Sequence, residues 1–480
     1  MNKRMILYIT GILLMIESML MVPSVIISLM DLDGLTMPIV LSLGITLASG
    51  GLLTVFSKPK DTMIFARDGL LTVSLGWIVL SLAGALPFWL SGQIPSFVDA
   101  FFETASGFTT TGASILTDVE ALSRSILFWR SFTHWIGGMG VLVFIMAVVP
   151  LASGGGNIHL MKAESPGFEA SKLVPRTAST AKILYLIYLA MTVMLIVLLR
   201  LGGMSTFESL TLAFGTAGTG GFGVLNSSIG SYSDYSKIVI TVFMTLFGVN
   251  FSCYYLILTG KLRDAVRNEE VRWYFAIYIG VSLIIALNIL GMYDGHFGRA
   301  ALDSFFQVSS VMTTTGYSTT DFDLWPSLSK TLMVLCMCFG ACAGSTGGGF
   351  KVSRVIVLVK YALVTVRDAF YPNRVHRVTL NGKNIEDNLL KSIGGYFALY
   401  MAIFLISTVL ISVDGFDFTT NVTAVVATLN NIGPGLGTVG ATGNYAGFSA
   451  FSKIVLCFDM IAGRLELLPM MILFSRRLWR

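Results

Sequence analysis

Long apolar runs dominate the chain. A helix of roughly 20 residues crosses the hydrocarbon core of a bilayer, about 30 Å thick. Runs of that length lie near residues 5–30, 36–57, 68–90, 124–150, 180–202, 236–260, 273–293, 389–412 and 452–476, and a tenth, interrupted run lies near 330–367. Only 12% of the 480 residues are charged, against roughly 25% in soluble proteins. We therefore expect an all-α polytopic protein embedded in a lipid bilayer.

Basic residues orient these spans. Of the 32 Lys and Arg residues, 24 fall in alternate loops and tails: before residue 5, and in 58–67, 162–182, 261–272, 351–391 and 476–480. The positive-inside rule places these segments and both termini in the cytoplasm. The first apolar run continues to Met30, which is too long for a signal peptide, so we expect an uncleaved helix. Topology thus explains the net charge of +5 without nucleic acid as a partner.

A glycine-rich strip occurs in each of four outer loops, after a moderately apolar segment of about 12 residues, which spans half a bilayer as a helix. The strips are TTTGA (Thr109–Ala113), GTGGF (Gly218–Phe222), TTTGY (Thr313–Tyr317) and IGPGL (Ile432–Leu436), and their aligned glycines are Gly112, Gly221, Gly316 and Gly435. Counting back 13 residues from these glycines gives Asp99, Glu208, Asp303 and Val422. We expect the three acids to stabilise helix N-termini rather than to handle ions.

Exposed backbone at membrane depth is tolerated only where it is buried in protein or lines a watery cavity. The four strips are therefore expected to surround one pore, where carbonyl groups and helix C-termini favour a cation. No acidic residue lies in the strips, which favours an alkali ion over Mg²⁺ or Ca²⁺. The alternative, four flexible outer loops, does not explain the common spacing. The predicted ion-binding residues are Thr110, Thr111, Gly112, Thr219, Gly220, Gly221, Thr314, Thr315, Gly316, Gly433, Pro434 and Gly435.

A second glycine-rich segment, Ala341–Lys351, interrupts the apolar run at 330–367, which would be about 57 Å long as one helix. It is either a simple hinge or, as we favour, a gate below the strips, formed by Gly344, Ser345, Thr346, Gly347, Gly348 and Gly349. Arg464 lies 12 residues into an expected helix of about 25, where a charge is costly. It either pairs with Glu466 or Asp459, or contacts the gate segment as a positive barrier, which we favour.

Other chemistries find little support in the sequence. The five cysteines lie in apolar segments and are expected to pack rather than to bind metal. His134 is expected to orient a polar contact. The segment GLGTVG, Gly435–Gly440, imitates a dinucleotide-binding loop but has no strand before it. There is no HExxH motif or credible Ser-His pair in the spans, so we expect neither an enzyme nor a cofactor in this chain.

The motifs ETASGFTTTGAS, WRSFTHWIGGMG, GTAGTGGFG, SSVMTTTGYST, GSTGGGFK and AGRLELLP, spread over residues 68–476, resemble the TrkH/KtrB/HKT superfamily of potassium transporters. Two helices before the first repeat make the chain more similar to bacterial TrkH than to the shorter KtrB. The resemblance implies four helix-pore-helix repeats, a K⁺ filter in which a glycine such as Gly112 goes with K⁺ preference, an intramembrane gate loop, and an arginine at the position of Arg464. Pro434 makes the fourth strip the most divergent.

The resemblance further implies a bacterial inner-membrane homodimer with one pore per subunit, docked on cytosolic RCK subunits of the TrkA or KtrA type that bind NAD or ATP. We divide the chain into two N-terminal helices (1–66) and four pore repeats (67–152, 153–262, 263–372 and 373–480). The expected function is K⁺ uptake through a channel-like pore. The alternative is a K⁺ symporter coupled to H⁺ or Na⁺, although membrane carboxylates are scarce.

Overall fold

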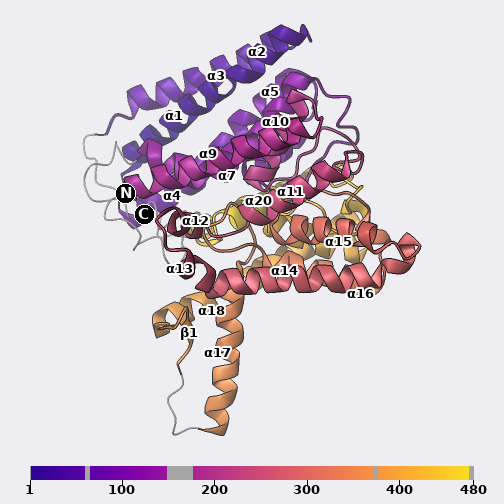
Figure 1. The fold of residues 1–480 in the computed structure, drawn as a ribbon. Helices are drawn as coiled ribbons and strands as arrows, with labels where there is room; N and C mark the ends of the chain where they lie inside the picture. The colour runs from indigo at the N-terminus through magenta and orange to yellow at the C-terminus, as the bar shows by residue number, and fades with distance from the viewer. Residues whose placement is uncertain (1, 60–64, 149–176, 372–376, 475–480) are drawn as a thin grey trace.

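The chain folds into a bundle of helices, which Figure 1 shows in a computed structural model. The structure describes residues 2–59, 65–148, 177–371 and 377–474. Two predicted repeat boundaries, 152/153 and 372/373, lie outside these ranges. Within the described residues the only strands are β1 (Thr379–Leu380) and β2 (Lys383–Asn384), which pair antiparallel. The expectation of an all-α fold is confirmed.

Two N-terminal spans precede the repeats. Helices α1 (Lys3–Leu20) and α2 (Val22–Asp31) run nearly continuously, and α3 (Thr36–Phe56) returns beside α1. Helices α1 and α3 approach each other closely at two glycines. A Cβ on Gly11 would lie 2.8 Å from the carbonyl oxygen of Gly50, and a Cβ on Gly50 would lie 2.7 Å from the carbonyl oxygen of Gly11. Small residues allow such close packing between helices in lipid.

Four repeats of span, short helix and span follow. The first contains α4 (Ala66–Gly84), α5 (Leu86–Leu90), α6 (Phe97–Phe108) and α7 (Arg124–Val148), and the second contains α9 (Thr177–Leu201), α10 (Thr206–Gly218), α11 (Asp234–Phe247) and α12 (Phe251–Leu258). The third contains α14 (Glu269–Asn288), α15 (Phe297–Met312), α16 (Ser327–Phe339) and α17 (Val352–Phe370). The fourth contains α18 (Asp387–Ile411), α19 (Phe418–Leu429), α20 (Ala450–Arg464) and α21 (Leu468–Ile472). Helix α13 (Leu262–Arg267) joins the second and third repeats, and short 3₁₀ turns lie at Leu290–Tyr293, Phe322–Leu324, Ser412–Asp414 and Gly437–Val439.

The short helices α6, α10, α15 and α19 are the predicted half-membrane helices. They contain 12, 13, 16 and 12 residues, or about 18 to 24 Å. Three of them begin at a capping side chain: Ser96, Ser205 and Asp417 accept a hydrogen bond from the backbone N–H three residues later. Helix α15 begins earlier than expected, so Asp303 lies in its second turn rather than at its start.

Three of the expected spans are broken. Among the described residues, six helices are long and apolar enough to cross a membrane alone, or seven if the bent pair α11 and α12 is one span. The expected span 236–260 bends by 91° between these two helices. The span 452–476 ends at Arg464, because Glu466 and Leu467 adopt left-handed backbone angles, and α21 follows. The span 330–367 is interrupted between α16 and α17, as predicted, and α17 projects from the body of the molecule (Figure 1).

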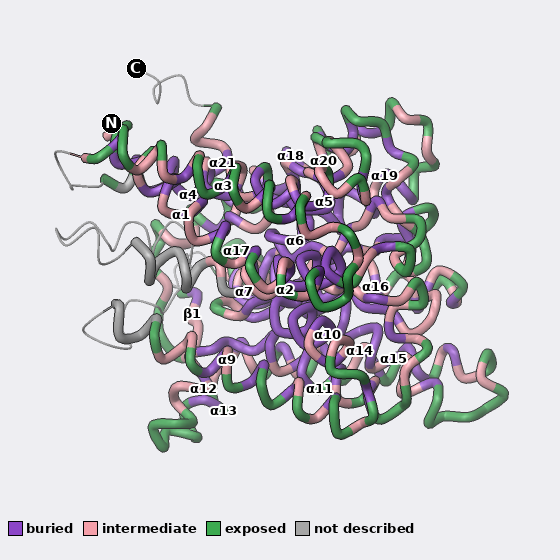
Figure 2. The backbone as a smooth tube through the Cα atoms, turned by 90° about the horizontal axis from the view of Figure 1, so that it is seen from above, coloured by how far each residue is buried: buried purple, intermediate pink, exposed green. Residues whose placement is uncertain are grey.

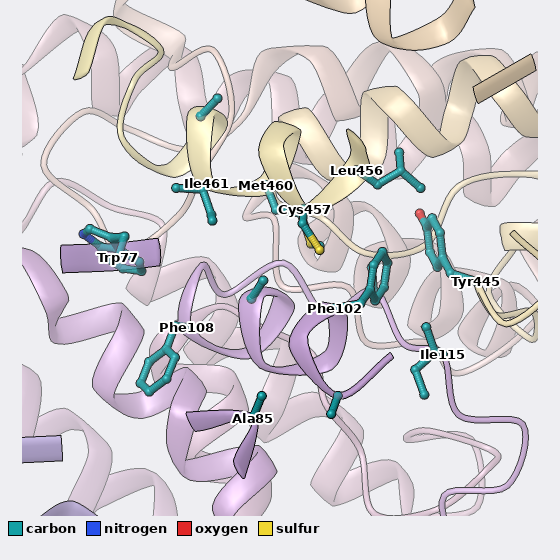
Figure 3. Packing of buried hydrophobic residues seen from close by; sticks show 14 of the residues in the cluster. Trp77, Ala85, Phe102, Phe108, Ile115, Tyr445, Leu456, Cys457, Met460 and Ile461 are labelled. Atoms are coloured by element: carbon teal, nitrogen blue, oxygen red, sulfur yellow. The ribbon is translucent and has the colours of Figure 1, made fainter. Parts of the chain in front are cut away.

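Buried residues concentrate at the centre of the bundle, around α6, α7 and α10 (Figure 2). In Figure 3, Phe102 of α6 faces Cys457 and Met460 of α20, whereas Phe108 lies at the other end of α6. All four are buried. The short helices are therefore held in a dense interior that fixes where their C-terminal ends point, and Cys457 packs there as expected.

Candidate functional site

The four strips follow directly on the C-terminal ends of the short helices and share an unusual backbone. In each strip a residue with φ between 54° and 60° is followed, two positions later, by a glycine with φ between 79° and 96°. The pairs are Thr110 and Gly112, Thr219 and Gly221, Thr314 and Gly316, and Asn431 and Gly433. Non-glycine residues rarely adopt such angles, and where they do the surrounding structure holds them there, commonly at functional sites.

The strips close into a ring. A Cβ on Gly112 would overlap the carbonyl oxygen of Gly220 in the second strip, and one on Gly221 would overlap that of Thr315 in the third. A Cβ on Gly316 would likewise overlap the carbonyl oxygen of Ile432, and a Cβ on Gly433 would lie 2.7 Å from the carbonyl oxygen of Thr111. Each glycine thus faces the backbone of the next repeat, in the order one, two, three, four and back to one. The lack of a side chain is what lets the ring close.

Most carbonyl groups of this ring accept no hydrogen bond from the described residues. Within the described part of the chain no donor reaches the backbone oxygens of Thr110, Thr111, Gly112, Thr219, Gly220, Gly221, Thr314, Thr315, Gly316, Asn431 and Ile432. Most of these residues are fully buried. Buried carbonyl groups in proteins are nearly always paired, so this ring of unpaired oxygens is unusual, and its chemistry is that of ligands for a cation.

The fourth strip is shifted by two residues from the sequence alignment. Gly433, not Gly435, occupies the place of Gly112, and Asn431 occupies the place of Thr110. Gly435 lies outside the ring, where its N–H donates to the carbonyl of Val439 at 2.7 Å. Pro434 borders Gly316, since a Cβ on that glycine would lie 3.0 Å from its Cδ. Helix α6 ends four residues before Gly112, and α19 ends four residues before Gly433. Aligning the strips on these helix ends gives the correct register.

The fourth strip also uses different side chains. Asn431 donates to the Thr111 hydroxyl at 3.0 Å and to the Met460 carbonyl at 2.8 Å, so it ties the fourth strip to the first and to α20. The Tyr445 hydroxyl donates to the carbonyl of Gly433 at 2.7 Å. That carbonyl is therefore engaged by the protein, unlike its counterparts. The divergence expected for this strip is real, and these polar side chains account for it.

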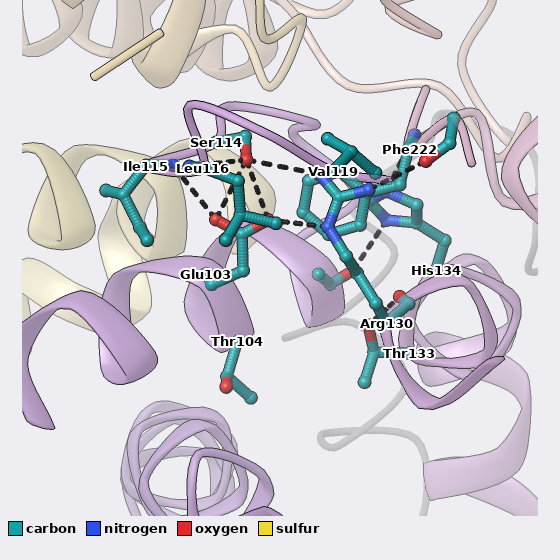
Figure 4. A network of polar contacts seen from close by, with 12 residues as sticks. Glu103, Thr104, Ser114, Ile115, Leu116, Val119, Arg130, Thr133, His134 and Phe222 are labelled. Atoms are coloured by element: carbon teal, nitrogen blue, oxygen red, sulfur yellow. Dashed lines mark hydrogen bonds and ion pairs between the residues drawn. The ribbon is translucent and has the colours of Figure 1, made fainter. Parts of the chain in front are cut away.

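A buried ion pair supports the first two strips (Figure 4). Arg130 of α7 binds Glu103 of α6 with an Nε–Oε1 distance of 2.6 Å, and both side chains are at least 97% buried. Glu103 accepts from the hydroxyl of Ser114 at 2.9 Å and the N–H of Ile115 at 3.0 Å, while Arg130 donates to the carbonyl of Gly223 at 3.0 Å. A charge pair in such surroundings needs these extra hydrogen bonds. This ion pair was not identified from the sequence.

His134 joins α6 to the second strip. Its Nδ1 is 2.9 Å from the carbonyl oxygen of Gly107, and its Nε2 accepts from the N–H of Phe222 at 3.3 Å. These two hydrogen-bond contacts agree with the expectation that His134 orients a polar contact.

The three acids before the strips have separate roles. Glu208 and Ser205 form a capping box at the start of α10, which confirms the expected role at a helix N-terminus. Asp99 pairs with Lys453 at 2.6 Å. Asp303 accepts from the hydroxyls of Tyr293 at 2.8 Å and Thr319 at 2.7 Å, so it ties α15 to the chain after its strip.

The segment between α16 and α17 lies against the ring. The N–H of Gly348 donates to the hydroxyl of Thr314 in the third strip at 2.7 Å. A Cβ on Gly347 would lie 2.8 Å from the carbonyl oxygen of Thr313, and one on Gly348 would lie 2.7 Å from that of Asn430. We call residues 340–351 the gate loop. It touches the third and fourth strips, and its glycines are what permit the contact.

One carboxylate holds both ends of the gate loop. Glu270, in the first turn of α14, accepts from the N–H of Ala343 at 2.7 Å and from the N–H of Ser353 at 3.0 Å. The carbonyl of Gly344 accepts from the N–H of Phe251 at 3.0 Å, at the start of α12. The break between α11 and α12 therefore serves to receive the loop. No local pattern around Glu270 indicated this role.

Arg464 reaches the gate loop from α20. Its guanidinium donates to the carbonyl of Thr346 at 2.8 Å and to the carbonyl of Gly137 in α7 at 2.8 Å. Glu466 instead pairs with Arg354, and Asp459 accepts from Ser407. Gly344, Ser345, Thr346, Gly347, Gly348, Gly349 and Arg464 are thus brought together, and the contact with the loop agrees with the interpretation that we favoured.

A vestibule lies on the other side of the ring. It has a cavity volume of about 170 Å³, opens to solvent and reaches Gly112, Gly221, Gly316 and Gly433. Its walls come from loops of all four repeats, among them residues 113–119, 223–228 and 439–445. The ring therefore separates a solvent-exposed vestibule from the gate loop.

Comparisons with known proteins agree with this architecture. The family model TrkH, described as cation transport protein, matches residues 36–480. The Trk system potassium uptake protein TrkH of Halomonas elongata is 34% identical and that of Escherichia coli strain K12 is 35% identical, each with 100% of both chains covered. The crystal structure of the potassium transporter TrkH from Vibrio parahaemolyticus superimposes with a TM-score of 0.89 at 32% identity, again over 100% of both chains. The chain is a multi-pass membrane transporter rather than an enzyme, and it belongs to the TrkH family of cation transport proteins.

Proposed function

We propose that the chain takes up K⁺ across the cell membrane through a selective, channel-like pore whose filter is the ring of four strips. The observation that carries the proposal is the set of buried carbonyl oxygens in the ring that no donor among the described residues reaches. Such oxygens replace the hydration shell of a weakly hydrated cation. The relatives named potassium uptake proteins support K⁺ as the ion.

The gate loop and Arg464 close this pore in our proposal. The loop lies against the third and fourth strips, and Arg464 adds a positive charge that repels cations on the far side of the filter from the vestibule. Its bond to the Thr346 carbonyl ties the arginine to the loop, so both move together when the pore opens. Opening then means the release of residues 344–349 from the ring.

The assembly and location are also proposals. We place the chain in a bacterial inner membrane with both termini in the cytoplasm, as a homodimer with one pore per subunit. The naming of the relatives after a Trk system supports further components, and we propose a cytosolic RCK subunit of the TrkA or KtrA type that carries NAD or ATP. Its contact would involve the basic segments 261–272 and 351–391. The repeats are proposed to span 67–152, 153–262, 263–372 and 373–480.

The second candidate is symport of K⁺ with H⁺ or Na⁺. Its support is that Asp459, fully buried in α20, has one carboxylate oxygen without a hydrogen-bond partner among the described residues. Such a group in a span is a candidate proton carrier. An imposed H⁺ or Na⁺ gradient would then drive K⁺ against its own gradient, which a channel cannot do.

Tracer uptake tests the main proposal. Liposomes containing only the purified chain are loaded with K⁺, and uptake of ⁸⁶Rb⁺ is followed with K⁺, Na⁺ or Li⁺ as competitor. We expect competition by K⁺ and not by Na⁺ or Li⁺, because the ring suits a large alkali ion. Equal competition by all three ions would contradict a selective ring.

The variant Arg464→Ala tests the gate. Removing the guanidinium removes a charge from the pore and a bond to the gate loop, so ⁸⁶Rb⁺ uptake is expected to rise. Arg299→Ala, which removes an exposed arginine from the start of α15, is the matched control. Unchanged uptake by a folded Arg464→Ala protein would refute the proposed barrier.

A further inference from the structure

A cavity within the spans contains a carboxyl group that the transport proposal does not use. It lies between α1, α4, α7 and the end of α6, has a cavity volume of about 50 Å³ and is partly open to the surroundings. Its lining residues are Leu13, Ile16, Glu17, Leu20, Gly76, Trp77, Leu80, Phe108, Ile136, Gly137 and Gly140.

Glu17 is the only charged residue among those lining residues. Its side chain is 98% buried, and neither carboxylate oxygen has a hydrogen-bond partner among the described residues. The residue lies 14 positions after Lys3 in α1, or about 21 Å along the helix, at hydrocarbon depth. A carboxylate in such surroundings is very unfavourable unless it carries a proton or meets a cation.

The walls determine which cation fits. An inorganic cation needs several oxygen ligands, and a buried water needs two to four polar partners, whereas this lining offers one carboxyl group. The aromatic rings of Trp77 and Phe108, whose positions Figure 3 shows, provide faces that attract an ammonium group, and the remaining lining is aliphatic. These features favour a single charged nitrogen attached to an apolar body.

We propose that this cavity is a binding site for a lipophilic amine that arrives from the bilayer and pairs its nitrogen with Glu17. A neutral amine meets the protonated carboxyl group, the O–H bond breaks, an N–H bond forms, and the resulting ammonium and carboxylate stay paired. No net charge enters the membrane. Gly137 belongs to the cavity wall and its carbonyl accepts from Arg464, so the occupant lies one helix away from the gate loop.

Photolabelling tests the site without any need for transport. The full chain is placed in nanodiscs of phosphatidylglycerol, which contains no amine, and is irradiated with dodecylamine that carries a diazirine. Mass spectrometry then locates the labelled peptides. We expect labelling at the cavity wall in α1 and α4, and a loss of about tenfold or more in Glu17→Gln, the factor that a strong charged contact provides.

Three controls complete the experiment. Glu120→Gln makes the same change at an exposed position and should leave the labelling unchanged. Ile16→Trp fills the cavity and keeps Glu17, so it should also abolish labelling, which keeps the test independent of how well Glu17→Gln folds. Nanodiscs with added phosphatidylethanolamine show the source of the occupant: competition supports a lipid headgroup amine, and none supports a free amine. The proposal would be overturned if Glu17→Gln or Ile16→Trp were labelled as strongly as the unmodified chain. It would also be overturned if the corresponding alcohol with a diazirine labelled the unmodified chain as strongly as the amine does.

Discussion

At the scale of single residues, the backbone rather than the side chains builds the candidate site. Gly112 has a φ of 79° and faces the carbonyl oxygen of Gly220. A side chain at Gly112 therefore encounters two obstacles, an unfavourable backbone angle and a neighbouring strip. The threonines contribute differently, because their hydroxyls hold the strips to each other and to the gate loop.

The variant Gly112→Ser separates these two obstacles when it is compared with Gly34→Ser. Gly34 has a φ of 76° but nothing within 4 Å of an added Cβ, so it carries the same backbone cost without the overlap. We expect Gly112→Ser to reduce the preference for K⁺ over Na⁺ by about tenfold, or ~1.4 kcal/mol, and Gly34→Ser to leave it unchanged. Competition of Na⁺ with ⁸⁶Rb⁺ uptake measures the preference. Equal preferences in the two variants would argue against Gly112 as a filter residue.

At the scale of elements, the gate loop is coupled to the third strip by one hydrogen bond that the first strip lacks. Thr314 and Thr110 occupy the same position in their strips, with similar φ angles of 60° and 54°. The Thr314 hydroxyl accepts from Gly348, whereas the Thr110 hydroxyl is buried without a partner among the described residues. The two threonines are therefore a matched pair.

Thr314→Val is expected to raise ⁸⁶Rb⁺ uptake by about fivefold, because a lost hydrogen bond of about 1 kcal/mol destabilises the closed loop. Thr110→Val removes the same hydroxyl without touching the loop, so its uptake should match that of the unmodified chain. Identical uptake by the two variants would show that the bond does not hold the gate.

The N-terminus of α19 offers a pH-dependent test of the capping. Asp417 accepts from Thr420, and this hydrogen bond, with others from the backbone, lowers the pKa of the Asp417 carboxyl below its usual value. A carboxyl with a lowered pKa contributes stability above its unfolded-state pKa, near 3.9, and loses it as the pH falls through the folded-state pKa. Asp417→Ala should therefore cost about 1 kcal/mol at pH 7, and less below pH ~4.

Melting temperatures between pH 7 and pH 3 measure this difference. Asp417→Asn is the matched control, because an asparagine caps a helix without titrating, so it should remain more stable than Asp417→Ala at every pH. A stability gap between the unmodified chain and Asp417→Ala that does not change with pH would contradict the proposed role of the carboxylate.

At the scale of the whole molecule, the sequence predicted the architecture more completely than it predicted the contacts between side chains. The half-membrane helices, the break between α16 and α17 and the position of three of the four glycine strips could be inferred because apolar length and glycine spacing are local patterns. The fourth strip was misaligned, because Asn430, Asn431 and Ile432 replace the threonines and leave only the GPG segment to align. Helix ends, which give the correct register, depend on tertiary packing.

The supporting contacts could not be inferred from one sequence. Glu103 and Arg130 are 27 positions apart, and Glu270 reaches the gate loop from 73 positions away. Each of these contacts lies within one repeat, and its geometry depends on how the helices of that repeat pack against each other. Polar residues in the spans could be marked as costly, yet the partner of each became visible only once the helices were packed.

The central claim is that one cation binding site is shared by the four strips. Crystals of the full chain grown in Rb⁺ or Tl⁺ test it directly, because both ions replace K⁺ and scatter anomalously. We predict anomalous density on the axis of the ring, bordered by the carbonyls of Thr111, Gly220, Thr315 and Ile432. Anomalous density only elsewhere, with none inside the ring, would contradict it.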